Sequence, residues 1–180
     1  AASDVYKRQP VEVIEEACQK ASELGVVTPA NYNTPAQIVI GGEGAAVDRA
    51  VELLQEAGTK RLIPLKVSGP FHTALLEPAS QKLAETLAQV SFSDFTCPLV
   101  GNTEAAVMKK EDIAQLLTRQ VKEPVHFYES IAVMQEAGIT NFIEIGPGKV
   151  LSGFVKKIDK TAKLANVEDQ ASLETLLENE

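Results

Sequence analysis

The apolar residues near the start of the chain recur first at helical and then at strand spacing. Positions three and four apart predict an amphipathic helix that Gly25 ends, with an inner face of Val11, Ile14, Cys18, Ala21 and Leu24. Residues 26–33 and 37–41 predict two short strands, which Thr34-Pro35 joins as an antiparallel pair.

A second helix and a third strand come next. The helix carries Val47, Ala50, Val51 and Leu54 on one face and ends at Gly58. The strand covers about residues 61–67, and Pro64 within it indicates an edge position, because proline donates no ladder hydrogen bond. The order helix, strand, strand, helix, strand predicts a ferredoxin-like βαββαβ unit that lacks its first strand.

The first nine residues do not fit this pattern. They show no periodicity and no turn that joins them to the first helix, so we interpret residues 1–9 as a non-native leader and exclude them from the predicted fold. The incomplete ferredoxin-like unit is therefore expected to cover residues 10–67.

Longer elements are predicted after residue 74. A helix at 75–89 should place Leu76, Ala79, Leu83 and Leu87 inward. Strands are expected at 98–100, 141–145 and 164–167, and helices at 110–121, 127–137, 150–158 and from residue 172. Strands that alternate with helices indicate part of a parallel, helix-flanked sheet, so the predicted fold class is α/β.

Charge and composition exclude several classes of function. The formal net charge of −8 argues against nucleic-acid binding, and no apolar run approaches the ~20 residues that span a bilayer. Cys18 and Cys97 have no spacing typical of a disulfide framework, which favours reduced thiols in a cytoplasmic protein.

The segment 67–73, Val-Ser-Gly-Pro-Phe-His-Thr, carries the main candidate for chemistry. Gly69 and Pro70 predict a sharp bend after the strand, and Thr73 could cap the next helix. A histidine held between two rigid elements is well placed to act as a general base, so His72 is a candidate catalytic residue. The alternative is that His72 only packs or caps the turn.

Other polar residues have functional and structural interpretations side by side. Asn31 and Asn33 share one face of a predicted strand, with Tyr32 on the other, and could either bind a polar ligand or form turn hydrogen bonds. The carbonyl of Gln120 could orient an imidazole. Residues 146–148, Gly-Pro-Gly, could receive an anion on their amides or simply form a tight turn.

Two classes of site are not predicted. His126 is interpreted as the residue that begins a helix, and together with His72 it has no metal-ligand spacing, so we expect no metal site. The sequence contains no Gly-x-Ser-x-Gly, the strained turn that exposes a nucleophilic serine. Ser68, which precedes the proline turn, is a poor candidate for that role.

Taken in order, the motifs resemble the C-terminal part of a bacterial malonyl-CoA:acyl-carrier-protein transacylase. The resemblance runs from about Val11 to the end of the chain. It depends on the segments Thr28-Pro-Ala-Asn-Tyr-Asn33, Gln37-Ile-Val-Ile-Gly-Gly42, Val67-Ser-Gly-Pro-Phe-His72, Leu117-Thr-Arg-Gln120 and Glu144-Ile-Gly-Pro-Gly-Lys-Val-Leu151. Each is weak alone, and their order and spacing are specific.

The resemblance implies a fold and a set of roles. Residues 68–180 would form the C-terminal part of an α/β-hydrolase-like large subdomain, with the active site in the cleft between it and the small subdomain. The implied reaction moves malonyl from coenzyme A to a serine, and then to the phosphopantetheine thiol of acyl carrier protein, in fatty-acid biosynthesis. His72 would be the base for both attacks, and the Gln120 carbonyl would hold its other ring nitrogen. Phe71 would select malonyl, and Asn31 and Asn33 would line the cleft.

The resemblance also implies partners and one large gap. Malonyl-CoA and the phosphopantetheine-bearing carrier protein would be substrates, no cofactor or metal is implied, and the full-length parent is expected to be a monomer. The serine elbow, the oxyanion-hole glutamine and the arginine for the malonyl carboxylate are missing from this sequence. We therefore expect the isolated chain to be catalytically inactive and to expose apolar sheet surface.

The sequence leaves two other functions open. The chain could be a non-catalytic module that binds acyl carrier protein or coenzyme A, since the elbow is missing. It could also come from the acyltransferase domain of a polyketide synthase, although its final residues give no sign of a linker.

Overall fold

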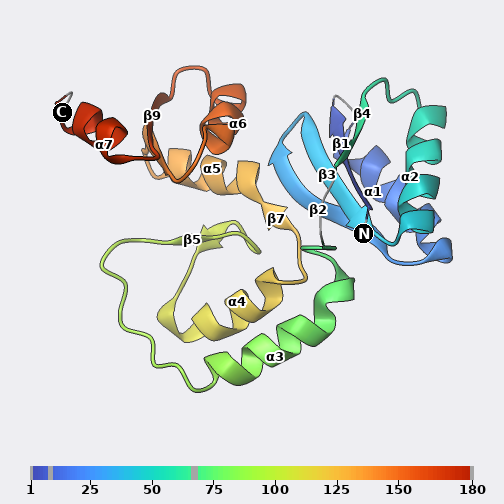
Figure 1. Cartoon of the computed structure of the whole chain (residues 1–180), viewed down its shortest axis with the longest axis horizontal. Helices are drawn as coiled ribbons and strands as arrows, with labels where there is room; N and C mark the ends of the chain where they lie inside the picture. The colour runs from blue at the N-terminus through green and yellow to red at the C-terminus, as the bar shows by residue number, and fades with distance from the viewer. Residues whose placement is uncertain (1, 8–9, 66–68, 179–180) are drawn as a thin grey trace. The chain divides into compact units, whose positions relative to one another are not determined.

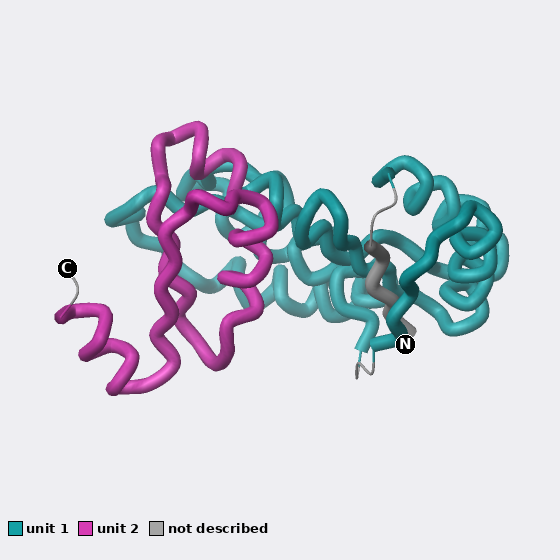
Figure 2. The backbone as a smooth tube through the Cα atoms, turned by 90° about the horizontal axis from the view of Figure 1, so that it is seen from above, with its two compact units in different colours: residues 1–130 teal, residues 131–180 magenta. Residues whose placement is uncertain are grey.

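The computed structural model describes residues 2–7, 10–65 and 69–178 of the chain. The chain divides into two compact units, residues 1–130 and 131–180, which Figure 2 shows in teal and magenta. The predicted boundary between residues 67 and 68 lies outside the described residues.

The first unit begins with strands and helices that build one sheet layer. Its strands and helices are β1 (Ala2–Lys7), α1 (Val11–Ala21), β2 (Val27–Thr34), β3 (Gln37–Gly42), α2 (Gly44–Glu56) and β4 (Leu62–Leu65). A short 3-10 turn, Ser22–Leu24, comes after α1, and Gly25 then takes a φ of 138°, which ends the helical segment as predicted.

The sheet has five strands in the order β4-β1-β3-β2-β7, where β7 is Val125–His126 (Figure 1). Within it, β1 pairs antiparallel with both β3 and β4, and β2 pairs antiparallel with β3. The edge position predicted from Pro64 is confirmed, because β4 lies at one end of the sheet. These pairings match the order of a βαββαβ unit.

The prediction that the first strand is missing is wrong. Residues 2–7 form β1, the second strand of this order, between β4 and β3, so they are part of the fold from which we excluded them. Hydrogen bonds to two neighbouring strands hold this segment extended, although its sequence carries no strand pattern.

Helices α1 and α2 cover one face of the sheet. Ile38 and Ile40 of β3 are 1% and 0% exposed and belong to the same cluster as Ile14 of α1 and Leu54 of α2. Burial of that cluster removes large apolar side chains from water, which is the main stabilising term of the unit. The opposite face of β3 carries Val39, which does not belong to the cluster.

The rest of the first unit is built from helices and very short strands. A 3-10 turn, Ala74–Leu76, leads into α3 (Glu77–Leu87), followed by β5 (Val100–Gly101), β6 (Ala106–Val107), the 3-10 turn Lys110–Asp112, α4 (Ile113–Gln120) and β7. Helix α5 (Phe127–Glu136) begins in the first unit and continues into the second. Met108, Ile113 and Leu116 form a small second core with Phe92 and Leu117 at its edge.

The predicted inner face of α3 is wrong in part. Ala79 is exposed, and the buried side chain of this helix is Ser80, whose hydroxyl donates to the Thr118 carbonyl of α4 at 2.7 Å. Because its hydroxyl has a hydrogen-bond partner, Ser80 can be buried at a position that the pattern of apolar residues does not predict.

The second unit is a parallel pair of strands with helices. Strands β8 (Asn141–Ile145) and β9 (Lys163–Val167) pair in parallel, as predicted, with α6 (Val150–Ile158) between them in the sequence and α7 (Gln170–Glu178) after them. Among the residues that the structure describes, no helix combines the length and apolar character needed to cross a bilayer.

Candidate active site

The turn that carries His72 is fixed by its own backbone and side chains. Residues 67 and 68 of the predicted motif lie outside the described residues, and the turn is described from Gly69 onward. Thr73 is the N-cap residue of the 3-10 turn at Ala74–Leu76, as predicted, but it makes no side-chain capping hydrogen bond, and its hydroxyl donates instead to the Pro70 carbonyl at 2.7 Å. His72 has a φ of 61°, the left-handed region that a non-glycine residue rarely adopts.

The imidazole of His72 is attached to the end of α4. Its Nδ1 lies 2.9 Å from the Gln120 carbonyl oxygen, and its backbone N–H donates to the Val121 carbonyl at 3.2 Å. The contact expected between His72 and Gln120 is therefore present in the structure. Because a carbonyl oxygen only accepts, Nδ1 must carry the proton, and the lone pair of the neutral ring then sits on Nε2. The half-buried ring can accept a proton at that atom.

The His72 turn packs against the face of the sheet that the helices leave uncovered. A Cβ built on Gly41 of β3 would lie 3.3 Å from the Thr73 methyl, so Thr73, which is 0% exposed, contacts the strand directly there. Asn31 of β2 pairs with Val39, and paired residues point to the same face. Since Val39 and Gly41 are two positions apart, Asn31 lies on the same face as the contact with Thr73.

Asn33 is placed differently from Asn31. Tyr32 pairs with Ile38 and Thr34 with Gln37, so the register shifts at Asn33 and leaves it as an extra, unpaired residue. A bulge breaks the alternation from which the two amides were placed on one face. Tyr32 lies on the face opposite Asn31, as predicted, and the structure shows that this is the helix-covered face, because Tyr32 belongs to the buried cluster.

Phe71 precedes His72 and is 59% exposed. Its ring folds back toward Gly69, where an added Cβ would lie 3.2 Å from the ring edge. A bulky ring that is open to solvent and next to a candidate base can restrict what approaches that base.

The second histidine, His126, stacks on an aromatic ring, a contact that the sequence did not indicate. His126 lies in β7, next to the start of α5, and its ring stacks on Tyr32 with centroids 4.8 Å apart and an angle of 11° between the planes. The Tyr32 hydroxyl donates to Glu15 at 2.8 Å, and burial followed by that hydrogen bond raises the pKa of Tyr32. The pair joins β2 to β7, and only the parallel pairing of these strands brings the rings together.

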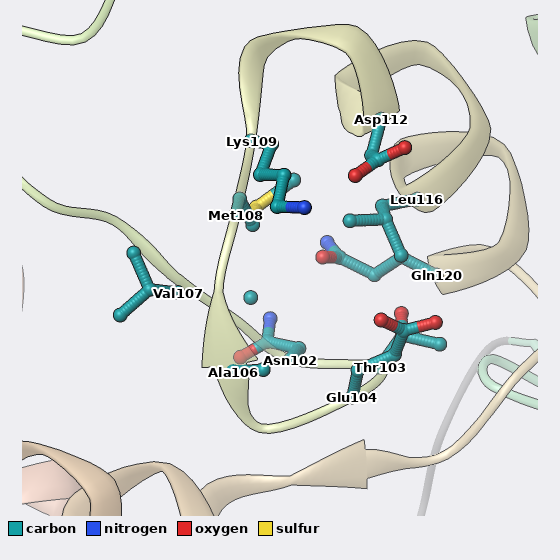
Figure 3. Close-up of a pocket in the computed structure, with 11 residues that line it drawn as sticks. Asn102, Thr103, Glu104, Ala106, Val107, Met108, Lys109, Asp112, Leu116 and Gln120 are labelled. Atoms are coloured by element: carbon teal, nitrogen blue, oxygen red, sulfur yellow. The ribbon is translucent and has the colours of Figure 1, made fainter.

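The backbone and the side chain of Gln120 face different parts of the structure. Its carbonyl binds His72, while its side chain lines a cavity of about 220 Å³ between α4 and the turn after β5. Figure 3 shows the amide of Gln120 directed into this cavity, together with Asn102 and Lys109. The Thr103 hydroxyl, which is buried at the same cavity, has no hydrogen-bond partner among the described residues.

The Gly-Pro-Gly turn does not offer its amides to an outside anion. The Gly148 N–H donates to Glu168, and the first amides of α6, on Leu151 and Ser152, donate to Glu144 at 3.0 and 2.7 Å. These hydrogen bonds, led by that from Ser152, lower the pKa of Glu144. The chain's own carboxylates therefore occupy the donors, and the interpretation as an anion site is wrong. Within the described ranges, no cluster of three His, Cys, Asp or Glu side chains could hold a metal ion.

Comparisons with known proteins give a consistent family. The sequence profile of the acyl transferase domain family matches residues 8–179. A malonyl CoA-acyl carrier protein transacylase of Bacillus subtilis is 45% identical over 169 residues, which are 93% of this chain and 53% of that protein. The transacylase of the same name from Escherichia coli K12 is 40% identical, over 92% of this chain and 54% of that protein. The chain thus spans about half the length of the curated relatives it matches.

Solved structures share the α/β fold. The crystal structure of MCAT from Streptococcus pneumoniae is 86% identical with a TM-score of 0.97, over 99% of this chain and 59% of that one. The complex PlMCAT:AntF, a type II PKS acyl-carrier protein with its malonyl-transacylase, matches at 40% identity and a TM-score of 0.94, over 99% and 58% of the chains.

Proposed function

Because the chain belongs to the acyl transferase domain family, we propose that it is the C-terminal part of a malonyl-CoA:acyl-carrier-protein transacylase of fatty-acid biosynthesis. The observation that carries this proposal is the attachment of His72 Nδ1 to the Gln120 carbonyl, at 2.9 Å. It leaves the opposite ring nitrogen free for proton transfer, at the position that the resemblance assigns to the base.

The proposed mechanism has two matched half-reactions. Nε2 of His72 takes the proton of a serine hydroxyl as the serine oxygen attacks the thioester carbon of malonyl-CoA. The same proton passes to the departing thiolate of coenzyme A. In the second half, Nε2 takes the proton of the phosphopantetheine thiol, the sulfur attacks the serine ester, and the proton returns to the serine oxygen. The Gln120 carbonyl holds the ring where a hydrolase triad would use a carboxylate.

We place the substrate between a small subdomain, the predicted 10–67 together with β1, and the predicted subdomain 68–180, which is of α/β-hydrolase type. Asn31 supports this assignment, because it lies on the face of the sheet that the His72 turn contacts. Asn33, at the bulge, is retained as a second cleft residue. Phe71 is proposed to select malonyl by limiting room beside the α-carbon, and its exposed ring is consistent with that role.

This chain supplies the base but not the nucleophile, so we propose that it is inactive alone. No Gly-x-Ser-x-Gly occurs in the sequence. On β8, Ile143 and Ile145 share one face and are 49% and 83% exposed. We propose that the remainder of the enzyme, which would contribute the serine, covers this apolar face.

The proposed partners are set by the reaction. Acyl carrier protein and coenzyme A thioester act as substrates rather than cofactors, and a relative at 40% identity forms a complex with a type II PKS acyl-carrier protein. A monomeric parent enzyme in the cytoplasm completes the proposal.

The test is a completed enzyme in which the N-terminal part of the Streptococcus pneumoniae relative precedes this chain. We expect malonyl transfer from malonyl-CoA to carrier protein, and a loss of about 10²–10⁴-fold in kcat for His72→Ala. The matched control is His126→Phe, which keeps a ring on Tyr32 and should stay within a few-fold of the parent. Transfer by His72→Ala at the parent's rate would contradict the assignment of the base.

A further inference from the structure

Two successive carbonyls at the end of α4 hold His72, and Arg119 stands immediately before them. We propose that Arg119 is a positioning residue: by binding Glu104 and Glu123 it fixes the direction of the carbonyls that hold the His72 ring and backbone. This inference rests on the proposed role of His72 as the base.

Glu123 binds Arg119 through both its backbone and its side chain. The backbone N–H of Glu123 donates to the Arg119 carbonyl at 2.9 Å, and its carboxylate accepts from Arg119 Nε at 2.9 and 3.0 Å. The last carbonyls of a helix have no partner within it. This closure satisfies the carbonyl of Arg119 inside the turn and leaves those of Gln120 and Val121 to the Nδ1–H and N–H of His72.

Glu104 binds the same guanidinium group and links it to a second turn. Its carboxylate accepts from Arg119 Nη1 in the turn between β5 and β6. The neighbouring Ala105 has a φ of 47°, so this turn takes a conformation that few non-glycine residues adopt. The planar guanidinium therefore bridges the turn after α4, which carries Glu123, and the turn that carries Glu104, a residue 15 positions before Arg119.

The geometry favours a positioning role over an ordinary surface ion pair. A single exposed pair on a helix contributes little to stability and does not by itself fix a direction. Arg119 is about one-third exposed, binds two carboxylates and meets Glu123 through both Nε and Nη2, which fixes orientation as well as distance. The pKa of Arg119 is raised, mainly by the hydrogen bond to Glu123 and then by that to Glu104.

Other contacts hold α4 in place without Arg119. Ser80 donates to the Thr118 carbonyl, and Lys122 pairs with Glu77 at the start of α3. Removal of the guanidinium should therefore leave the helix docked and change the direction of its terminal carbonyls. The expected effect is local to His72.

The first measurement is NMR of the full 180-residue chain at about pH 8.5, where a histidine ring is neutral. Two readouts are monitored: the hydrogen-exchange rate of the His72 backbone amide, and the ratio of the Nδ1–H to the Nε2–H tautomer from ¹⁵N shifts. Arg119→Gln should speed the exchange and lower the tautomer ratio by about tenfold each, and Arg119→Lys should give an intermediate change. The control, Lys110→Gln, removes an exposed pair with Asp94 and should change neither.

Unchanged readouts at His72 in a folded Arg119→Gln variant would overturn the proposal. If that variant does not fold, Glu104→Gln decides, because it leaves the Glu123 contacts intact. A few-fold change at His72 then supports the positioning role, and values equal to those of the unmodified chain overturn it.

The second measurement separates this inference from the proposed function. In the completed enzyme, Arg119→Gln should lower kcat about tenfold with KM unchanged, since the proposed role of Arg119 is exerted through His72 and not through contact with the substrate. A completed enzyme that transfers no malonyl with any residue at position 119 contradicts the proposed function, while the NMR result still decides the role of Arg119.

Discussion

The methyl group of Thr73 packs directly on the backbone of Gly41. A Cβ at position 41 would lie 3.3 Å from that methyl and 3.7 Å from the Cβ of Ala30. Thr73 cannot retreat easily, because it is fully buried and its hydroxyl is bonded to Pro70. A methyl group added at position 41 would therefore press on Thr73 unless the turn or the strand shifts by a few tenths of an ångström.

We expect Gly41→Ala to be destabilising for this reason. The added methyl must displace Thr73 or the strand, and overpacking of this kind costs about 1–3 kcal/mol in free energy of unfolding. The measurement is urea denaturation monitored by circular dichroism. Gly44→Ala is the matched control, because it lies at the start of α2 with open space around it and should stabilise by about 0.5–1 kcal/mol. Equal stabilities for the two variants would contradict the tight contact.

The backbone of His72 gives a second prediction, which concerns stability rather than activity. At a φ of 61° an alanine is strained and a glycine is not. Both His72→Ala and His72→Gly lose the hydrogen bond to Gln120, so the difference between them isolates the backbone term. We expect His72→Gly to be the more stable by about 1 kcal/mol in urea denaturation. A more stable alanine variant would argue against the left-handed turn.

Cys18 provides a prediction of pH dependence. Burial in α1, with a smaller contribution from the charge of Glu15, raises the pKa of the Cys18 thiol to about 12. The fold therefore favours the neutral thiol, whereas an unfolded chain ionises it near its ordinary value of about 8.5–9. The stabilising contribution is complete below that pH and is lost as the pH rises toward 12.

The comparison of the unmodified chain with Cys18→Ala tests this sign. Between about pH 9 and pH 11, the unmodified chain should lose about 1.4 kcal/mol per pH unit relative to the variant. Cys97→Ala is the control, because that thiol is exposed and should leave the pH dependence unchanged. A difference between the unmodified chain and Cys18→Ala that stays constant with pH would show that the thiol is not protected by the fold.

Most regular elements were predictable because their signals are local. The spacing of Val11, Ile14 and Cys18 predicts α1, and Thr34-Pro35 predicts the turn that joins two strands, which do pair antiparallel. The strand β1 was missed because nothing in residues 2–7 marks it, and only pairing with β3 and β4 holds it extended. The short strands β6 and β7 were missed for the same reason, since two residues are too few to show an alternation of apolar and polar positions.

The sequence alone determined that a histidine comes after a glycine–proline bend, that its motifs resemble one family, and which segments form helices and longer strands. The tertiary structure decided that this ring is held by the carbonyl of Gln120, 48 positions later, and that Tyr32 stacks on His126. It also decided that Arg119 joins two turns. The physical reason is range: backbone dihedrals and apolar periods are set by neighbours in the chain, whereas a hydrogen bond or a ring contact between distant residues exists only after the chain has packed.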